Sequence, residues 1–363
     1  MGIIKEEKLK FLFNQFNHTS EFKLFEELAS GHINDTYLIK THEKPYFVLQ
    51  RINHKVFKNV PGLIHNKVAI SRHLKEKLGH LSEQVLRRHV LDFINTKNGA
   101  PYYKDKDGNY WNMMVYIEDS VTFETVNNEE VAYEGGKLFG NFLFLTSDFL
   151  ASKLTDVIPK FHDMSFRFSQ FEEALKVASV ERLNLANTYI TEVNELKEEM
   201  HILQKLKESG AIKLRVTHND TKISNALFDK DNKGLCVIDT DTVMPGIVHY
   251  DFGDAIRTIC NTAPEDEKKL ELVNFNICYY KAYVKGFLEK IESDLSAVEI
   301  EHLPLGAKTM IFIMAIRFLT DFLNGDIYYK TAYPEHNLDR AKNQFKLIES
   351  LSEKFKEMGI NNL

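Results

Sequence analysis

The sequence predicts an α+β fold with two lobes, a small N-terminal lobe built on an antiparallel sheet and a larger, mainly helical C-terminal lobe. Short strand-like runs separated by turns fill most of the first 117 residues, whereas the later residues mostly show the apolar spacing of helices. A length of 363 residues also suits two lobes. We therefore expect a sheet-based lobe over residues 1–117 and a helical lobe over residues 118–363.

The N-terminal lobe opens with a helical apolar pattern over residues 7–17. Five segments then have strand character, namely 22–28, 36–41, 46–52, 90–96 and 110–117. A turn-rich loop over 29–35 joins the first two of these strands, and a helix is expected over 62–78 between the third and the fourth. These elements together predict an antiparallel sheet.

Beyond the joint near residues 117–120 the chain becomes helical. Helix formers with helical apolar spacing occupy residues 129–150, 167–178 and 182–209. A β-rich interruption follows over 213–242, after which helices are expected to the C-terminus. Residues 214–254, here named the catalytic segment, overlap this interruption.

The composition excludes several classes of partner. The chain has 46 basic and 52 acidic residues and a net charge of −6, so it has no general attraction for nucleic acid or for an anionic membrane. The longest apolar run, residues 310–316, is far shorter than the roughly 20 residues that span a bilayer. The three cysteines form no Cys-x-x-Cys pair, which favours reduced thiols. We expect a cytoplasmic protein.

Three polar residues in the catalytic segment point to chemistry. Asp220 and Asn225 follow a short strand, and Asp239 comes at the exit of an apolar strand that closes a predicted hairpin. We expect the three side chains at the ends of neighbouring strands, facing one cavity. This pattern predicts a site built from two carboxylates and a carboxamide.

Phosphoryl transfer requires these residue types. Magnesium neutralises the charge on the phosphate oxygens and prefers oxygen ligands, which Asn225 and Asp239 supply. A further carboxylate, Asp220, accepts the proton of the attacking hydroxyl. The five-residue spacing of Asp220 and Asn225, with His218 two residues before the aspartate, is that of the kinase catalytic loop.

Simpler interpretations of these polar residues also exist. The polar residues of 218–225 would also suit a solvated loop, but their apolar flanks and ordered spacing favour the kinase interpretation. His218 is interpreted as a buried imidazole that holds the loop backbone, not as a base. Residues 229–234 resemble the start of a calcium loop, yet Lys233 and Thr240 occupy ligand positions, so a hairpin turn is expected there.

Together with the run Asp251–Asp254, these residues resemble the superfamily of aminoglycoside phosphotransferases and choline kinases, small-molecule kinases with a protein-kinase-like fold. The segments THNDTK, VIDTDTVMPG, YDFGDAIR and IRFLTDFLNGDIYY are similar to those of the N-acetylhexosamine 1-kinases in that superfamily, as are SGHINDTYLI and VLQRIN. The likeness extends from about residue 27 to about residue 348.

The resemblance implies ATP-dependent phosphorylation of the anomeric hydroxyl of GlcNAc or GalNAc, giving the sugar 1-phosphate and ADP, with Asp220 as base and Asn225 and Asp239 as Mg²⁺ ligands. ATP would bind between the lobes, with the linker 115–121 against the adenine. The implied nucleotide-binding residues are Ser30, Gly31, His32, Asn34 and Gln50. The implied substrate-binding residues are His32, Asp220, Asp241, Arg317 and Tyr328.

The sequence departs from the general kinase pattern at two places. The phosphate loop has a single glycine, Gly31, and Gln50 occupies the position of the lysine on the third strand. Which cation steadies the phosphates stays open, with Lys222 and a second magnesium ion as candidates. Asp241 would contact a sugar hydroxyl or a second metal, or equally cap a turn.

Several further alternatives stay open. Arg317 would bind sugar hydroxyls or pair with Asp321 one helical turn on. Asp254 is expected to brace the catalytic loop. The acceptor of another small-molecule kinase would be choline, ethanolamine, homoserine, methylthioribose or an aminoglycoside. Gln50 and the glycine-poor loop leave a catalytically inactive binding module as a further alternative, and the oligomeric state is not predicted.

Overall fold

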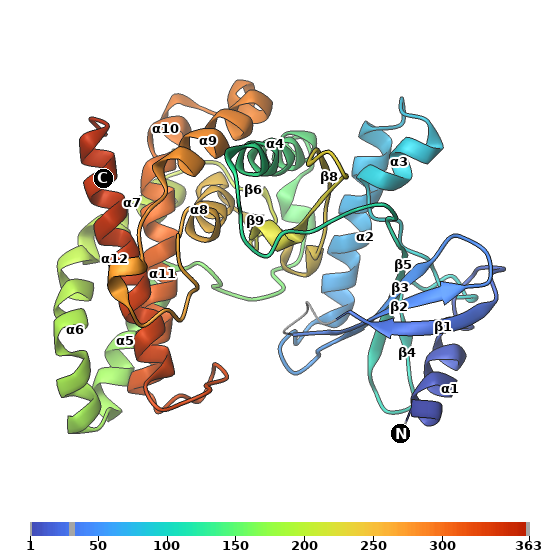
Figure 1. Ribbon diagram of the computed structural model, residues 1–363, viewed down its shortest axis with the longest axis horizontal. Helices are drawn as coiled ribbons and strands as arrows, with labels where there is room; N and C mark the ends of the chain where they lie inside the picture. The colour runs from blue at the N-terminus through green and yellow to red at the C-terminus, as the bar shows by residue number, and fades with distance from the viewer. Residues whose placement is uncertain (1, 29–32, 361–363) are drawn as a thin grey trace. The chain divides into compact units, whose positions relative to one another are not determined.

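The computed structural model describes residues 2–28 and 33–360 (Figure 1). They form two compact units, each assembled from separate parts of the chain. Unit 1 contains residues up to Thr122 together with Leu145–Pro159 and Asn225–Pro245, and unit 2 contains Phe123–Phe144, Lys160–Ser224 and Gly246–Leu363. The expected division at residue 117 lies near the first of these boundaries and stays a prediction.

Unit 1 is built on a five-stranded antiparallel sheet of order β1-β2-β3-β5-β4. Its strands are β1 (Phe22–Glu27), β2 (Asp35–Thr41), β3 (Phe47–Ile52), β4 (Tyr103–Lys104) and β5 (Tyr110–Val115). Its helices are α1 (Gly2–Phe13), α2 (Val60–Lys77), α3 (Glu83–His89) and the short η1 (Ala151–Lys153). The later part of unit 1 adds β7 (Ala226–Phe228), β8 (Gly234–Val237) and η3 (Thr240–Thr242).

The side chains of the sheet alternate between two faces, as the period of a strand requires. One face packs against helix α1 in a core that includes Phe13, Ile39, Leu49 and Trp111. The opposite face carries Met114 and Val48, which pack with Leu91, Ile117 and the antiparallel hairpin β7–β8. The hairpin therefore belongs to the sheet unit although it lies more than 100 residues later in the chain.

Unit 2 is mainly helical and is organised around α11 (Leu303–Leu323), which packs against α5, α8 and α12 (Figure 1). The other elements are α4 (Glu129–Leu145), α5 (Met164–Val177), α6 (Val180–Met200), α7 (Ile202–Glu208), β6 (Arg215–Thr217), α8 (Val248–Ile259), η4 (Leu270–Leu272), α9 (Ile277–Ile291), η5 (Glu292–Asp294), α10 (Ala297–Glu301) and α12 (His336–Glu357). Two elements, η2 (Ile223–Asn225) and β9 (Met244–Gly246), lie at the unit boundaries.

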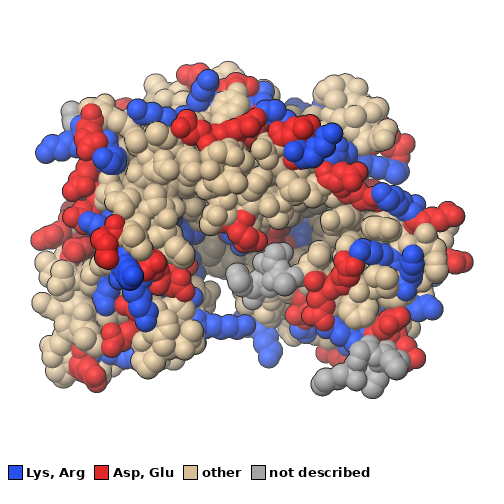
Figure 2. Space-filling view, in the orientation of Figure 1, with Lys and Arg blue, Asp and Glu red and all other residues tan. Residues whose placement is uncertain are grey.

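Helix α11 is long and apolar enough to cross a membrane, and it is the one such helix in the part of the chain that the structure describes. Its apolar window is 83% buried inside the protein, which is typical of the central helix of a folded core. Over the face shown in Figure 2, acidic and basic side chains are interspersed.

The structure confirms the predicted fold class, a five-stranded antiparallel sheet at the N-terminus and a larger helical part. The strand expected over 90–96 is wrong, because this segment contacts β5 only through isolated bonds such as Ile94 N–H to the Met113 carbonyl, at 2.8 Å. The helix expected over 182–209 is interrupted at His201, which separates α6 from α7.

Candidate functional site

The loop that carries Asp220 lies in unit 2 and is held by two buried carboxylates of helix α8. Asp251 accepts hydrogen bonds from the backbone N–H groups of the two residues before Asp220, each at 2.7 Å. Asp254 accepts one from the backbone N–H of the residue after it, at 3.0 Å. Because these bonds bracket Asp220 on both sides, helix α8 holds the backbone that carries the Asp220 carboxylate.

Burial perturbs both bracing carboxyl groups. Desolvation raises the pKa of Asp251 to about 6, against the opposing effects of His218 and of the two backbone hydrogen bonds. Desolvation also raises the pKa of Asp254, while the ion pair with Arg257, at 3.0 Å, acts to lower it. Asn219 adopts a left-handed backbone with φ of 64°, an unfavourable conformation of the kind that clusters at functional sites.

Two other residues of this loop have defined partners. The imidazole of His218 is fully buried between the rings of Phe139 and Phe142, with centroids about 6 Å away, which agrees with a structural role. Lys222 forms an ion pair with Asp220, at 3.2 Å, and both side chains are partly exposed. Lys222 therefore lies beside the predicted base.

Asn225 and Asp239 lie together at the open end of the hairpin β7–β8 in unit 1. Ala226 pairs with Val237, and the N–H of Ile238 donates to the carbonyl of Asn225 at 2.9 Å, so the two predicted ligands flank the same end of the hairpin. Asp239 has a left-handed backbone with φ of 55°. A strained, non-glycine residue at a strand exit is again typical of a functional position.

A buried polar network lies on helix α2 and the face of the sheet in unit 1. The ammonium of Lys67, only 2% exposed, forms an ion pair with Oδ1 of Asp241 and donates to Oε1 of Gln50 at 3.2 Å. Asn34 donates to Oδ2 of Asp241 at 2.5 Å. Both carboxylate oxygens of Asp241 thus have protein partners, and the network connects the end of the phosphate loop to β3, α2 and η3.

Arg317 lies on helix α11 in unit 2 among aromatic rings. Its guanidinium lies 5.5 Å from the ring centroids of Phe161 and Tyr329, and it donates to Sδ of Met314 at 3.4 Å. The alternative pairing with Asp321 is wrong, because Asp321 accepts the backbone N–H groups of residues 327–329 at 2.8–3.1 Å. Asp321 therefore holds the loop after α11 and leaves Arg317 to other partners.

The same cluster contains polar groups that the sequence did not indicate. Arg167 lies close enough to Arg317 that burial and this second guanidinium together lower its pKa to about 10. Burial, then Arg317 and Arg167, keep the pKa of His162 well below its ordinary value. Within residues 2–28 and 33–360, Arg167 donates to the carbonyl of Phe161 and to the side chain of Gln170, and neither arginine has a carboxylate at ion-pair distance. The hydroxyl of Tyr329 is buried without a hydrogen-bond partner among these residues.

Comparison with known families identifies the chemistry of this arrangement. Residues 25–272, more than half of the chain, match the family described as "Phosphotransferase enzyme family". The chain belongs to this phosphotransferase family. The matched range contains the Asp220 loop, the hairpin with Asn225 and Asp239, and the Lys67 network, but ends before Arg317.

Solved structures share the fold of this phosphotransferase over nearly their whole length. A microcompartment-associated aminopropanol kinase has a TM-score of 0.63 at 14% identity, with 98% of this chain and 99% of that chain covered. An aminoglycoside phosphotransferase from Alicyclobacillus acidocaldarius has a TM-score of 0.62 at 15% identity, with 96% of each chain covered. An amicoumacin kinase in complex with AMP-PNP and Ca²⁺ has a TM-score of 0.60 at 12% identity, again with 96% of each chain covered. The expected kinase-like fold is confirmed.

The residues of the phosphotransferase fit a divalent cation bound with a nucleotide. Among the described residues no group of three or more His, Cys, Asp or Glu side chains forms a metal cluster. Magnesium in kinases needs only one or two protein oxygens besides the phosphates and waters, and the carboxamide of Asn225 and the carboxylate of Asp239 provide these. A bound Mg²⁺ would neutralise charge on the transferred phosphate.

The structure divides the sequence-predicted residues between the two units. Asn34, Gln50, Asn225, Asp239 and Asp241 lie in unit 1, and Asp220, Arg317 and Tyr328 lie in unit 2. Ser30, Gly31 and His32 lie outside the described residues. Tyr328 is 69% exposed, and its neighbour Tyr329 contacts Arg317 instead. Lys67, Arg167 and His162 were missed, because no motif marks them and only folding brings them to these sites.

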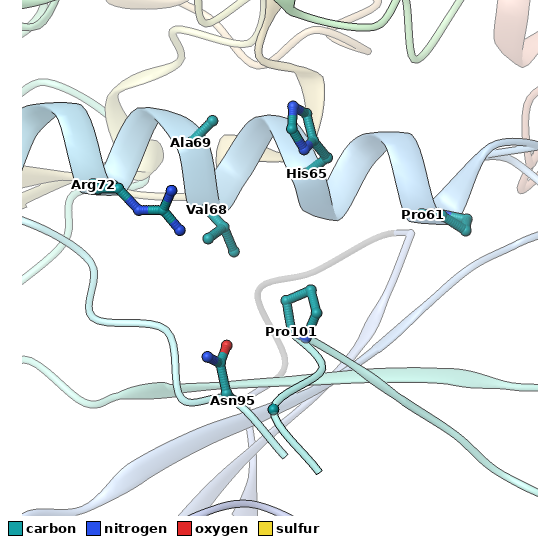
Figure 3. Close-up of a pocket in the computed structure, with 8 residues that line it drawn as sticks. Pro61, His65, Val68, Ala69, Arg72, Asn95 and Pro101 are labelled. Atoms are coloured by element: carbon teal, nitrogen blue, oxygen red, sulfur yellow. The ribbon is translucent and has the colours of Figure 1, made fainter. Parts of the chain in front are cut away.

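A separate cavity of about 380 Å³ opens beside α2 in unit 1. Figure 3 shows Val68 and Arg72 of this helix on the side that faces Asn95 and Pro101. At 100° per residue, Lys67 projects from a different face of α2. None of the predicted catalytic, metal-binding or nucleotide-binding residues lines this cavity.

Proposed function

We propose that this phosphotransferase transfers the γ-phosphoryl group of ATP, with Mg²⁺, to the anomeric hydroxyl of an N-acetylhexosamine, giving the sugar 1-phosphate and ADP. The motifs shared with N-acetylhexosamine 1-kinases support the acceptor, and the family match supports phosphoryl transfer.

In the proposed reaction the C1 hydroxyl of the sugar attacks the γ-phosphorus as the bond to the ADP oxygen breaks. Asp220 orients this hydroxyl and takes its proton, while the bonds from Asp251 and Asp254 keep the carboxylate in place. Asn225 and Asp239 hold Mg²⁺. Asn34 and Gln50, with Ser30, Gly31 and His32, contribute to the nucleotide site, and Asp241 acts through its contacts with Asn34 and Lys67.

The observation that carries the choice of acceptor is the pair of arginines, Arg167 and Arg317, without a carboxylate partner in the described part of unit 2. Two like charges repel a cationic acceptor, so choline, ethanolamine and aminoglycosides are disfavoured. Sugar hydroxyls and an N-acetyl carbonyl offer oxygen acceptors to the guanidinium of Arg317. We place the sugar against Arg317, Tyr329 and Tyr328, with His32 as a further contact.

The same observation favours one second candidate. An acceptor with a carboxylate, such as a hexuronic acid, would neutralise the two guanidinium charges through charge-assisted hydrogen bonds. This candidate keeps the same base, metal ligands and nucleotide site, and changes only the group that the arginines bind.

An acceptor panel tests the proposal. The protein, ATP and Mg²⁺ are combined with GlcNAc, GalNAc, glucose, glucuronic acid, choline or an aminoglycoside, and ³¹P NMR locates the phosphate. We expect a 1-phosphate from the N-acetylhexosamines and none with Asp220→Asn. Transfer to choline or the aminoglycoside contradicts the argument from the arginines, and transfer to glucuronic acid alone selects the second candidate. Nucleotide binding without any transfer would indicate a binding module.

A further inference from the structure

We infer that Lys67 of helix α2 supplies the cation that holds the nucleotide phosphates, in place of the lysine that strand β3 lacks; this inference rests on the proposed use of ATP. In kinases of this fold a lysine on β3 contacts the α- and β-phosphates and pairs with a glutamate on the following helix. Here β3 carries the neutral Gln50, and the helix that follows carries the positive charge.

The position of the Lys67 ammonium supports the proposal that this residue replaces the β3 lysine. Nζ of Lys67 lies 3.2 Å from Oε1 of Gln50, so the charge reaches the side chain that stands where the β3 lysine would be. Lys67 therefore brings a positive charge next to the side chain at the β3 lysine position, although its own Cα lies on helix α2. Lys222, the cation considered from the sequence, belongs to unit 2 and pairs with the predicted base.

The partners of Lys67 connect it to the two segments that surround the phosphates in this proposal. Asp241 comes two residues after Asp239, one of the proposed magnesium ligands, and it pairs with Lys67. Its other oxygen accepts from Asn34, whose Oδ1 in turn accepts the backbone N–H of Asn53 at 2.9 Å. Lys67 thus lies on the path from the phosphate loop to the metal-binding segment, entirely within unit 1.

The network has unused hydrogen-bonding capacity. An ammonium has three donors, and Asp241 and Gln50 account for two of those on Lys67, which leaves one for a phosphate oxygen. Asn112 lies directly opposite Gln50 on β5, and its carboxamide is fully buried with no partner for either polar atom among the described residues. The amide of Asn112 therefore has hydrogen-bonding capacity beside Gln50 that the described protein groups do not use.

A purely structural ion pair is the competing explanation. Removing Lys67 alone would leave the Asp241 carboxylate buried without a counter-charge, and weaker nucleotide binding would then have two causes. The comparison that isolates the cation is Asp241→Asn against the double variant Lys67→Met with Asp241→Asn, because neither protein contains an unpaired carboxylate at this site. Lys75→Met, which removes the Lys75–Asp92 ion pair at the end of the same helix, is the matched control.

The experiment measures dissociation constants for Mg·ADP and for adenosine by isothermal titration calorimetry. We expect the double variant to bind Mg·ADP at least tenfold more weakly than Asp241→Asn, with adenosine affinity changed less than twofold, and we expect Lys75→Met to match wild type for both ligands. Equal Mg·ADP affinity in the two Asp241 variants would overturn the inference, and so would an equal loss for both ligands, which indicates a structural role.

The result of this binding experiment can be distinguished from the result of the acceptor panel that tests the proposed function. A wild-type protein that binds Mg·ADP but phosphorylates no N-acetylhexosamine refutes the proposed acceptor and leaves the Lys67 comparison intact. A wild-type protein that binds Mg·ADP no better than adenosine contradicts both proposals, since no residue then recognises the phosphates.

Discussion

The substitution Asp251→Asn tests how the buried end of helix α8 positions the catalytic loop. Both oxygens of this carboxylate, 1% exposed, accept backbone N–H groups at 2.7 Å. Asparagine keeps one acceptor and turns an NH₂ group toward the other backbone donor, so one hydrogen bond is lost and one buried N–H is left unsatisfied. Since hydrogen bonds to charged groups contribute about 1.5–3 kcal/mol each, we expect a loss of about 2–4 kcal/mol in unfolding free energy.

The pH dependence of the unfolding free energy provides a second, independent test of the role of Asp251. Burial raises the pKa of Asp251 to about 6 in the folded protein, above its value in the unfolded chain. Between these two values the folded state therefore binds a proton that the unfolded state does not, and this group stabilises the wild type increasingly as the pH falls through 6. Asparagine does not titrate, so the stability gap between wild type and Asp251→Asn should widen from pH 7.5 to pH 5.

The assay is urea unfolding at both pH values, with kcat measured at pH 7.5, where we expect at least a tenfold decrease. Asp229→Asn is the matched control, because Oδ1 of Asp229 also accepts two backbone N–H groups, at 2.8 and 2.9 Å, but near the surface. The control should lose less than about 1 kcal/mol. A loss for Asp251→Asn no greater than that of the control, or a gap that narrows at pH 5, would refute the reasoning.

Two further predictions concern packing and acceptor binding. A Cβ added at Gly253 of α8 would lie 2.1 Å from the carbonyl oxygen of Gly306 on α11, so Gly253→Ala should lower the unfolding free energy by about 1–3 kcal/mol or more; an unchanged urea midpoint would contradict this close approach. Arg317→Met should raise the KM for the sugar at least tenfold and leave the KM for ATP within twofold, and equal changes in the two constants would exclude a specific role in acceptor binding.

The local geometry of the segment with Asp220, Asn225 and Asp239 was predictable because its spacing reflects a backbone requirement. Asp220 and Asn225 are separated by one short loop, and Asp239 follows the hairpin that begins at Asn225. Distances along so short a stretch of chain are limited by strand and turn geometry, so order and spacing suffice to predict that Asn225 and Asp239 flank one end of the hairpin. The antiparallel sheet was predictable for the same reason, since neighbouring strands are joined by short turns.

The tertiary contacts were less predictable. The sequence offered Lys222 or a second magnesium ion to steady the phosphates, whereas the structure shows Lys67 of helix α2 paired with Asp241, 174 residues away. The sugar contact expected for Tyr328 stays a prediction, and the structure adds its neighbour Tyr329, whose ring lies 5.5 Å from the guanidinium of Arg317. Neighbouring residues of an irregular loop can differ completely in burial, and no periodic pattern in the sequence shows which of the two is buried.

The sequence by itself therefore determined the two-lobed α+β class, the loop with the proposed base and the pair of proposed metal ligands, because each depends on patterns within a few tens of residues. Only the tertiary structure decided which charges meet. It brought Lys67 to Gln50 and Asp241, and Arg167 to Arg317, through burial of side chains on elements far apart in the chain. Ionic interactions depend on distance and on burial, and both quantities exist only after the elements have packed.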